Sequence, residues 1–144
     1  MKGIEAMTYL GGSTNDADAL TMTGTQVLNQ YNGARGDTPR IAVMITDGGS
    51  SNAQAAAQAA DKLRQQNIGV MVVGVGNQVS QTDLNNIADS PAADNTFMVN
   101  NYDNLDSISD QLIAQMCTGI VIFFIWLSLV HCSYHKLRQF SVQP

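Results

Sequence analysis

The chain has 144 residues, of which 44% are hydrophobic and 13% are charged. This length and composition allow one domain with a packed core and exclude an intrinsically disordered chain. The formal net charge is −5, and all twelve acidic residues precede Gln111. We therefore expect no nucleic-acid partner and a domain that is compatible with cation binding. Two cysteines, Cys117 and Cys132, are too few for a disulfide framework.

The first part of the chain predicts two helices and a turn. Apolar residues within positions 3–10 share one helical face, which Gly11-Gly12 ends. Because almost nothing precedes this helix, we expect the chain to begin inside a longer domain. Polar residues at positions 13–16 can cap a second helix over about residues 15–30. Residues 33–37 then form a polar turn.

A short apolar run at residues 41–45 predicts a strand that is buried on both faces. In open α/β sheets, ligands bind beyond the carboxyl ends of such strands. Asp47 stands at that end, followed by Gly48-Gly49-Ser50-Ser51, and its carboxylate is suited to a hard cation held by oxygen ligands. On these residues alone, the preferred interpretation is a simple turn made by Asp47 and the glycines.

Strands and helices alternate through the rest of the domain. Further strands are predicted at residues 68–76 and 96–99, and helices at residues 53–66, after Ser80 and at residues 103–117. The strand–helix–strand order predicts a parallel crossover. The predicted fold class is therefore α/β, with a doubly wound, mainly parallel sheet.

Several ordered motifs resemble von Willebrand factor type A domains. Tyr9-Leu10-Gly11-Gly12-Ser13-Thr14-Asn15 resembles their Tyr-x-Gly-Gly-x-Thr-Asn stretch. Gly33-Ala34-Arg35 and residues 41–48 resemble their Gly-Ala-Arg turn and the Asp-Gly end of a strand. The resemblance covers about residues 3–117 and is closest to the modules of matrilins and collagen VI-like matrix proteins. It implies the family's Rossmann-like sheet without its first strands, so we expect an unpaired strand edge and poor stability of this chain alone.

The resemblance also implies a metal-ion-dependent adhesion site, which favours a metal role for Asp47 over a simple turn. Thr14 and Asp47 match two of the family's ligands for Mg²⁺ or another divalent cation in the full-length domain. The other three belong to an Asp-x-Ser-x-Ser loop, which does not occur in the 144 residues. Ser50-Ser51 is no substitute, because it follows the second Asp loop. We therefore expect weak or no cation binding by this chain.

The implied function is a protein-binding module that is not an enzyme and whose partner is an extracellular matrix or cell-surface protein. In the family a cysteine before the first strand pairs with one after the last helix, so Cys117 is expected to be free or paired with Cys132. The alternative is a nucleotide-binding or hydrolytic α/β enzyme that uses Asp47 and the loop at residues 74–76. Against it, the chain has no phosphate loop with lysine and no nucleophile elbow.

The composition changes abruptly after Cys117. We divide the chain into a partial domain at residues 1–117 and an apolar and basic tail at residues 118–144. Residues 119–132 are a short membrane-span candidate. The apolar stretch of residues 116–132 that contains them would be roughly 25 Å long as a helix, against a hydrocarbon core of about 30 Å. The basic flank would place the domain outside the cell. A membrane-tethered receptor fragment is thus the alternative to a secreted protein, and a gene-model error explains the tail equally well.

Overall fold

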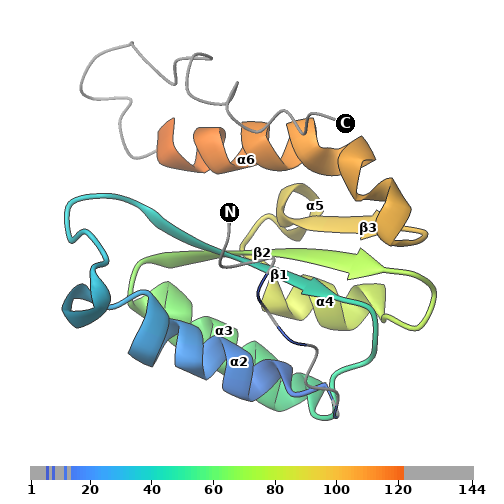
Figure 1. Ribbon diagram of the computed structural model, residues 1–144, viewed down its shortest axis with the longest axis horizontal. Coiled ribbons are helices and arrows are strands. Elements are labelled where there is room, and N and C mark those ends of the chain that lie inside the picture. Colours follow the sequence, from blue (N-terminus) through green and yellow to red (C-terminus); the bar gives the residue numbers. More distant parts are fainter. Residues whose placement is uncertain (1–5, 7, 9–11, 13, 122–144) are drawn as a thin grey trace. The chain divides into compact units, whose positions relative to one another are not determined.

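The structure is a computed structural model that describes residues 6, 8, 12 and 14–121. The chain divides into two compact units, Met1–Asn104 and Leu105–Pro144. A parallel sheet and the helices packed on it belong to the first unit, and the last helix lies in the second (Figure 1). The helix predicted at residues 3–10 and most of the membrane-span candidate at residues 119–132 lie outside the described residues.

The sheet has three parallel strands in the order β1-β2-β3. They are β1 (Arg40–Thr46), β2 (Ile68–Val75) and β3 (Thr96–Val99), and all three were predicted. The expectation that β1 is buried on both faces is wrong, since Val43 and Ile45 are 39% and 52% exposed. The register pairs Val43 of β1 with Met71 of β2. Apart from Gly69, every residue of β2 is buried, which explains its nearly continuous run of apolar side chains. The parallel pairing confirms the predicted α/β class.

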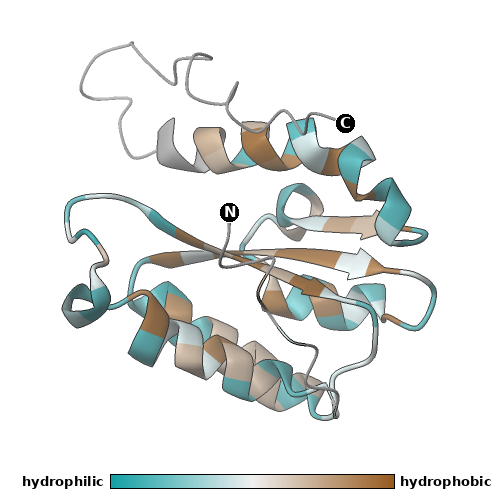
Figure 2. Cartoon of the chain, in the orientation of Figure 1, coloured by the Kyte–Doolittle hydropathy of each residue, from teal (hydrophilic) through white to brown (hydrophobic). Residues whose placement is uncertain are grey.

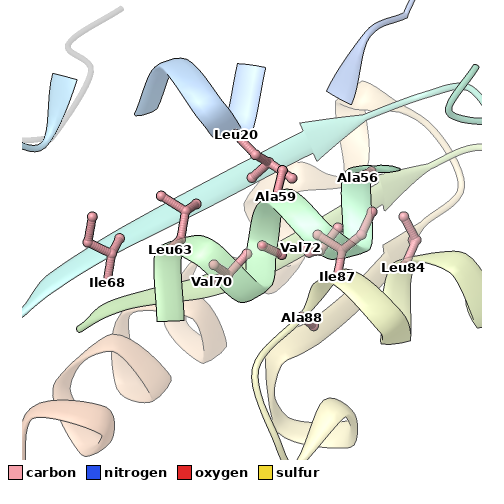
Figure 3. Close-up of a cluster of buried hydrophobic side chains, with 11 residues drawn as sticks. Leu20, Ala56, Ala59, Leu63, Ile68, Val70, Val72, Leu84, Ile87 and Ala88 are labelled. Carbon is pink, nitrogen blue, oxygen red and sulfur yellow. The ribbon is translucent and has the colours of Figure 1, made fainter. Parts of the chain in front are cut away.

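Three helices cover one side of the sheet, namely α2 (Asp16–Met22), α3 (Ala53–Gln65) and α4 (Gln81–Ile87) (Figure 1). Their inner faces are hydrophobic and their outer faces are largely hydrophilic (Figure 2). Alanines on α3 let this helix approach its neighbours closely. The core between these elements contains Leu20, Ala56, Ala59, Ala60, Leu63, Ile68, Val70, Val72, Leu84, Ile87 and Ala88 (Figure 3).

The helix predicted at residues 15–30 is shorter and less regular than expected. Its N-cap is Asn15, whose side-chain oxygen accepts a backbone N–H at 3.2 Å. The helix is α-helical only to Met22 and continues as a π-helix, Thr23–Val27. Hydroxyl groups compete for its carbonyl oxygens, which bends helices. The side chains that donate to the carbonyl four residues earlier are Thr21, Thr23 and Thr25.

The last predicted helix also differs from expectation. It begins as a 3-10 helix, Tyr102–Ile108, and becomes α-helical only in α6 (Ser109–Val121). The Asn104 N–H is shared by the carbonyl and side-chain oxygens of Asn101, three residues earlier, which favours the tighter turn. A short helix, α5 (Ala92–Asn95), was not predicted. Within the described ranges, no helix has both the length and the hydropathy that a bilayer crossing requires.

Candidate functional site

The two predicted metal ligands lie near each other at the carboxyl edge of the sheet. Asp47 directly follows the last residue of β1 and is exposed. Thr14 precedes α2, and its Oγ1 lies 3.6 Å from the position that a Cβ would take on Gly48. The loop is tightened by Thr46, whose hydroxyl donates to the Gly48 carbonyl at 3.3 Å. The structure thus brings Thr14 and the Asp47 loop together, while their role as metal ligands stays a prediction.

Asp16 is a buried acid beside this loop. It lies in the first turn of α2 and is only 7% exposed. Burial raises the pKa of the Asp16 carboxyl, and a hydrogen bond with Ser50 offsets part of that rise. The Ser50 hydroxyl is buried, yet among the described residues no partner meets standard hydrogen-bond geometry with it. We therefore describe the contact between Asp16 and Ser50 as loose.

Tyr102 approaches Asp47 from beyond the end of β3. Its side chain is exposed, and its hydroxyl lies close enough to the Asp47 carboxylate for a hydrogen bond between them to affect its pKa. This hydrogen bond raises the pKa of Tyr102, with further increases from partial desolvation and from the negative charge of Asp47. The Asp47 carboxylate therefore already serves as an acceptor at the surface of the site.

The oxygen atoms at this edge are of the type that binds a divalent cation, but there are too few of them to fill its coordination shell. A hydroxyl from Thr14 and a carboxylate from Asp47 are donors that Mg²⁺ prefers, but an octahedral shell needs six. In the part of the chain that the structure describes, no group of three or more His, Cys, Asp or Glu side chains is placed to hold a metal ion. These two groups alone therefore do not complete such a shell.

Sequence reasoning did not single out Asp16 or Tyr102 for this site, and it considered Ser50 only to reject it as a substitute metal ligand. The contact between Asp16 and Ser50 depends on how α2 meets the loop after β1, which residue spacing does not encode. The sequence held a weak indication that Tyr102 belongs to this site, because Tyr102 lies three positions after the last residue of β3. The carboxyl ends of parallel strands meet at one edge, so a side chain just beyond β3 lies on the same edge as Asp47.

Comparison with known proteins assigns the fold to a family. The family model for the von Willebrand factor type A domain matches residues 1–111. The chain belongs to this family. The assignment confirms the membership and the Rossmann-like α/β fold expected from the motifs.

Two curated relatives and one solved structure illustrate the similarity. The chain is 32% identical over 117 residues to von Willebrand factor A domain-containing protein 2 of Xenopus laevis, covering 81% of this chain and 14% of the relative. It is 30% identical over 119 residues to the collagen alpha-4(VI) chain of Mus musculus, covering 81% of this chain and 5% of the relative. The structure of proximal thread matrix protein 1 from the mussel byssus, solved with a zinc-occupied MIDAS motif, matches with a TM-score of 0.75 and 24% identity. That match covers 81% of this chain and 29% of the mussel protein, and it shows a shared fold.

Proposed function

We propose that the chain is a protein-binding module of an extracellular matrix or cell-surface protein and that it is not an enzyme. The chain spans only 14% and 5% of the two relatives above, so a whole protein's activity is an inference for this chain. The family and the matrix proteins among the relatives support the proposal. The observation that carries it is the position of the Thr14 hydroxyl beside the Asp47–Gly48 loop.

In this proposal, Thr14 and Asp47 hold a divalent cation, with Mg²⁺ as the expected ion. The cation would supply a positive charge that attracts an acidic side chain of the partner. Tyr102 hydrogen bonds to Asp47 and would border the same surface. Because the 144 residues contain no Asp-x-Ser-x-Ser loop, we expect a dissociation constant on the order of 10⁻³ M, as in weak extracellular cation sites.

Cation binding by the full chain tests the site. Mn²⁺, which has a strong electron paramagnetic resonance signal when free, would be titrated into wild-type protein and into Asp47→Asn and Thr14→Ala variants. We expect weak binding by the wild type and its loss in both variants. Asp94→Asn is the matched control, because Asp94 is an exposed acid in α5. Equal binding by the wild type and Asp47→Asn would refute the assignment.

Binding to a cell-free matrix tests the function. Labelled chain would be added to the matrix that cultured fibroblasts leave after cell removal, with Mg²⁺ or with a chelator. We expect retention in Mg²⁺ that falls in the chelator and in Asp47→Asn. If neither the chelator nor Asp47→Asn reduces retention, recognition does not depend on a cation at this site.

The alternatives retained from the sequence make opposite predictions. A nucleotide-binding enzyme would be stabilised against heat by nucleotides, because a ligand that binds only the native state raises its stability. We expect no such shift with ATP, GTP or NAD. The division at residue 117 and the membrane-tethered alternative stay predictions. Partitioning of the whole chain into the aqueous phase without detergent would count against the tether.

A further inference from the structure

A second surface lies at the opposite end of β1 from Asp47. The tripeptide Arg35-Gly36-Asp37 lies in the loop between the 3-10 helix Gln30–Asn32 and the start of β1, and all three residues are exposed. Figure 1 shows this segment as the cyan loop at the amino end of the strand, whereas Asp47 follows the carboxyl end. The surface is therefore separate from the proposed cation site.

The loop is held at both ends by hydrogen bonds. Before it, the backbone carbonyl of Asn29 accepts the Ala34 N–H at 3.0 Å, and the Asn29 side chain accepts the Asn32 N–H at 2.9 Å. After it, the Arg40 guanidinium donates to the carbonyls of Leu28 at 2.8 Å and Gln66 at 2.5 Å. These contacts fix the chain on either side of the tripeptide, which lowers the entropy that is lost when a partner binds it.

The middle residue of the tripeptide lies against the Gln30 side chain. A Cβ on Gly36 would lie 2.6 Å from Nε2 of Gln30, so a larger residue would displace that side chain. Across the tripeptide, the Thr38 hydroxyl donates to the Arg35 carbonyl at 3.4 Å. The local structure thus forms a turn with a basic and an acidic side chain on either side of glycine.

Both charged groups are available to a partner. Over residues 14–121, the salt bridges found join Arg64 to Asp61 and Asp89 and involve neither Arg35 nor Asp37. Tyr31, four residues before the tripeptide, is 97% exposed. Tyrosine and arginine are enriched among the residues that dominate binding energy in protein interfaces.

We propose that this loop is a binding site for a cell-surface receptor of the Arg-Gly-Asp-binding kind. Such a receptor would offer a divalent cation to the Asp37 carboxylate and an acidic pocket to the Arg35 guanidinium. A carboxylate is a preferred ligand of hard cations, and guanidinium–carboxylate pairs are the stronger charge-assisted hydrogen bonds. The proposal does not rest on the Thr14–Asp47 site, since here the chain supplies the acid rather than the cation.

Cell adhesion tests this proposal. The full chain would be coated on plastic in Mg²⁺, and cells that spread on a synthetic Arg-Gly-Asp peptide would be added. We expect adhesion that a soluble Arg-Gly-Asp peptide inhibits and an Arg-Gly-Glu peptide does not. Asp37→Glu keeps the charge but lengthens the side chain, which moves the carboxylate away from the position where it would bind the receptor's cation. It should therefore reduce the number of attached cells by about tenfold or more.

The controls separate this loop from the other site and from misfolding. Asp94→Glu makes the same chemical change on an exposed acid elsewhere and should leave adhesion unchanged. Inhibition by the soluble Arg-Gly-Asp peptide separates adhesion through this loop from any binding through the Asp47 site. Circular dichroism must show the same unfolding midpoint for Asp37→Glu and the wild type. Failure of these cells to adhere to the wild type, or equal adhesion to Asp37→Glu, would overturn the proposal.

Discussion

At the scale of single residues, Asp16 combines burial with charge. It is nearly inaccessible to solvent, and burial raises its pKa above the ordinary value of 3.8, although Ser50 lowers it in part. A pKa raised by folding means that the folded state disfavours the ionised form. The contribution of Asp16 to stability therefore improves as pH falls through the folded-state pKa and levels off below 3.8. We expect Asp16→Asn to be more stable than the wild type at pH 7, with a smaller difference in acid, as measured by urea unfolding.

Asp18 provides the control for this prediction. It is an exposed acid in the same helical turn, where a negative charge stabilises the N-terminus of a helix. Asp18→Asn removes the same charge and should lose about 0.3–1 kcal/mol rather than gain stability. A loss of stability at pH 7 in Asp16→Asn, or the same change in both variants, would contradict the prediction.

Tyr102 reports on the charge of Asp47. The hydrogen bond to Asp47, with smaller effects of desolvation and of the Asp47 charge, raises the pKa of Tyr102 above 10.0. Neutralising that carboxylate should reverse the rise, so we expect Asp47→Asn to lower the pKa of Tyr102 toward 10.0. Ultraviolet titration of tyrosinate measures this, with the Tyr102→Phe curve subtracted to isolate one residue. Saturating Mg²⁺ should also lower the pKa of Tyr102. If the pKa of Tyr102 is the same in Asp47→Asn and the wild type, Tyr102 does not contact Asp47.

At the scale of elements, the π-helix Thr23–Val27 packs on α3 through a glycine. A Cβ on Gly24 would lie 2.7 Å from Cδ2 of Leu63, which is fully buried. Alanine favours a helix over glycine by about 1 kcal/mol. We expect the overlap to outweigh this gain, because a packed core cannot move Leu63 freely, and Gly24→Ala should lose about 1–3 kcal/mol in urea unfolding.

Gly49→Ala is the control for Gly24→Ala, because it makes the same chemical change at a glycine without a close neighbour. The nearest atom to a Cβ on Gly49 is the Gln78 carbonyl oxygen at 3.8 Å, which is an ordinary contact. We expect a change within about 0.5 kcal/mol, as for surface substitutions in general. If both glycines respond alike, the close packing of Gly24 on α3 does not govern stability.

Periodicity predicted most of these elements but not their irregular parts. The apolar runs of β1, β2 and β3 are short and bounded by turn residues, so all three strands were identified. The π-helix was missed because the competition of threonine hydroxyls for carbonyls depends on rotamers rather than on composition. The single turn of α5 is too short to show any helical period.

The site shows the same division between pattern and geometry. Strand topology made Asp47 a candidate, the family motif favoured a metal role over a simple turn, and Thr14 was proposed through the family motif alone. The structure adds that Thr14 lies beside Gly48, which neither argument could supply. Asp16, Ser50 and Tyr102 reach this edge from three different segments, so only the tertiary arrangement brings them together.

At the scale of the whole molecule, the outer edge of β1 is the feature that we expect to govern self-association. β1 pairs with β2 on one side, and no other strand of the described sheet lies on its opposite side. Val43 and Ile45 are 39% and 52% exposed on this strand, although both are large apolar residues. An apolar edge strand offers unpaired backbone groups to another chain. We therefore expect the chain to self-associate as its concentration rises.

A lysine on this strand should suppress the association, because edge charges are a common means by which natural sheets avoid pairing with one another. In Ile45→Lys, the half-exposed position lets the long side chain reach water, so folding should survive the change. Sedimentation equilibrium over a concentration series would show a lower average mass than the wild type. Tyr31→Lys removes a more exposed apolar residue away from the edge and should leave the mass unchanged. If the wild type is monomeric with a cooperative unfolding transition, or if both variants act alike, the open edge of β1 does not drive the association.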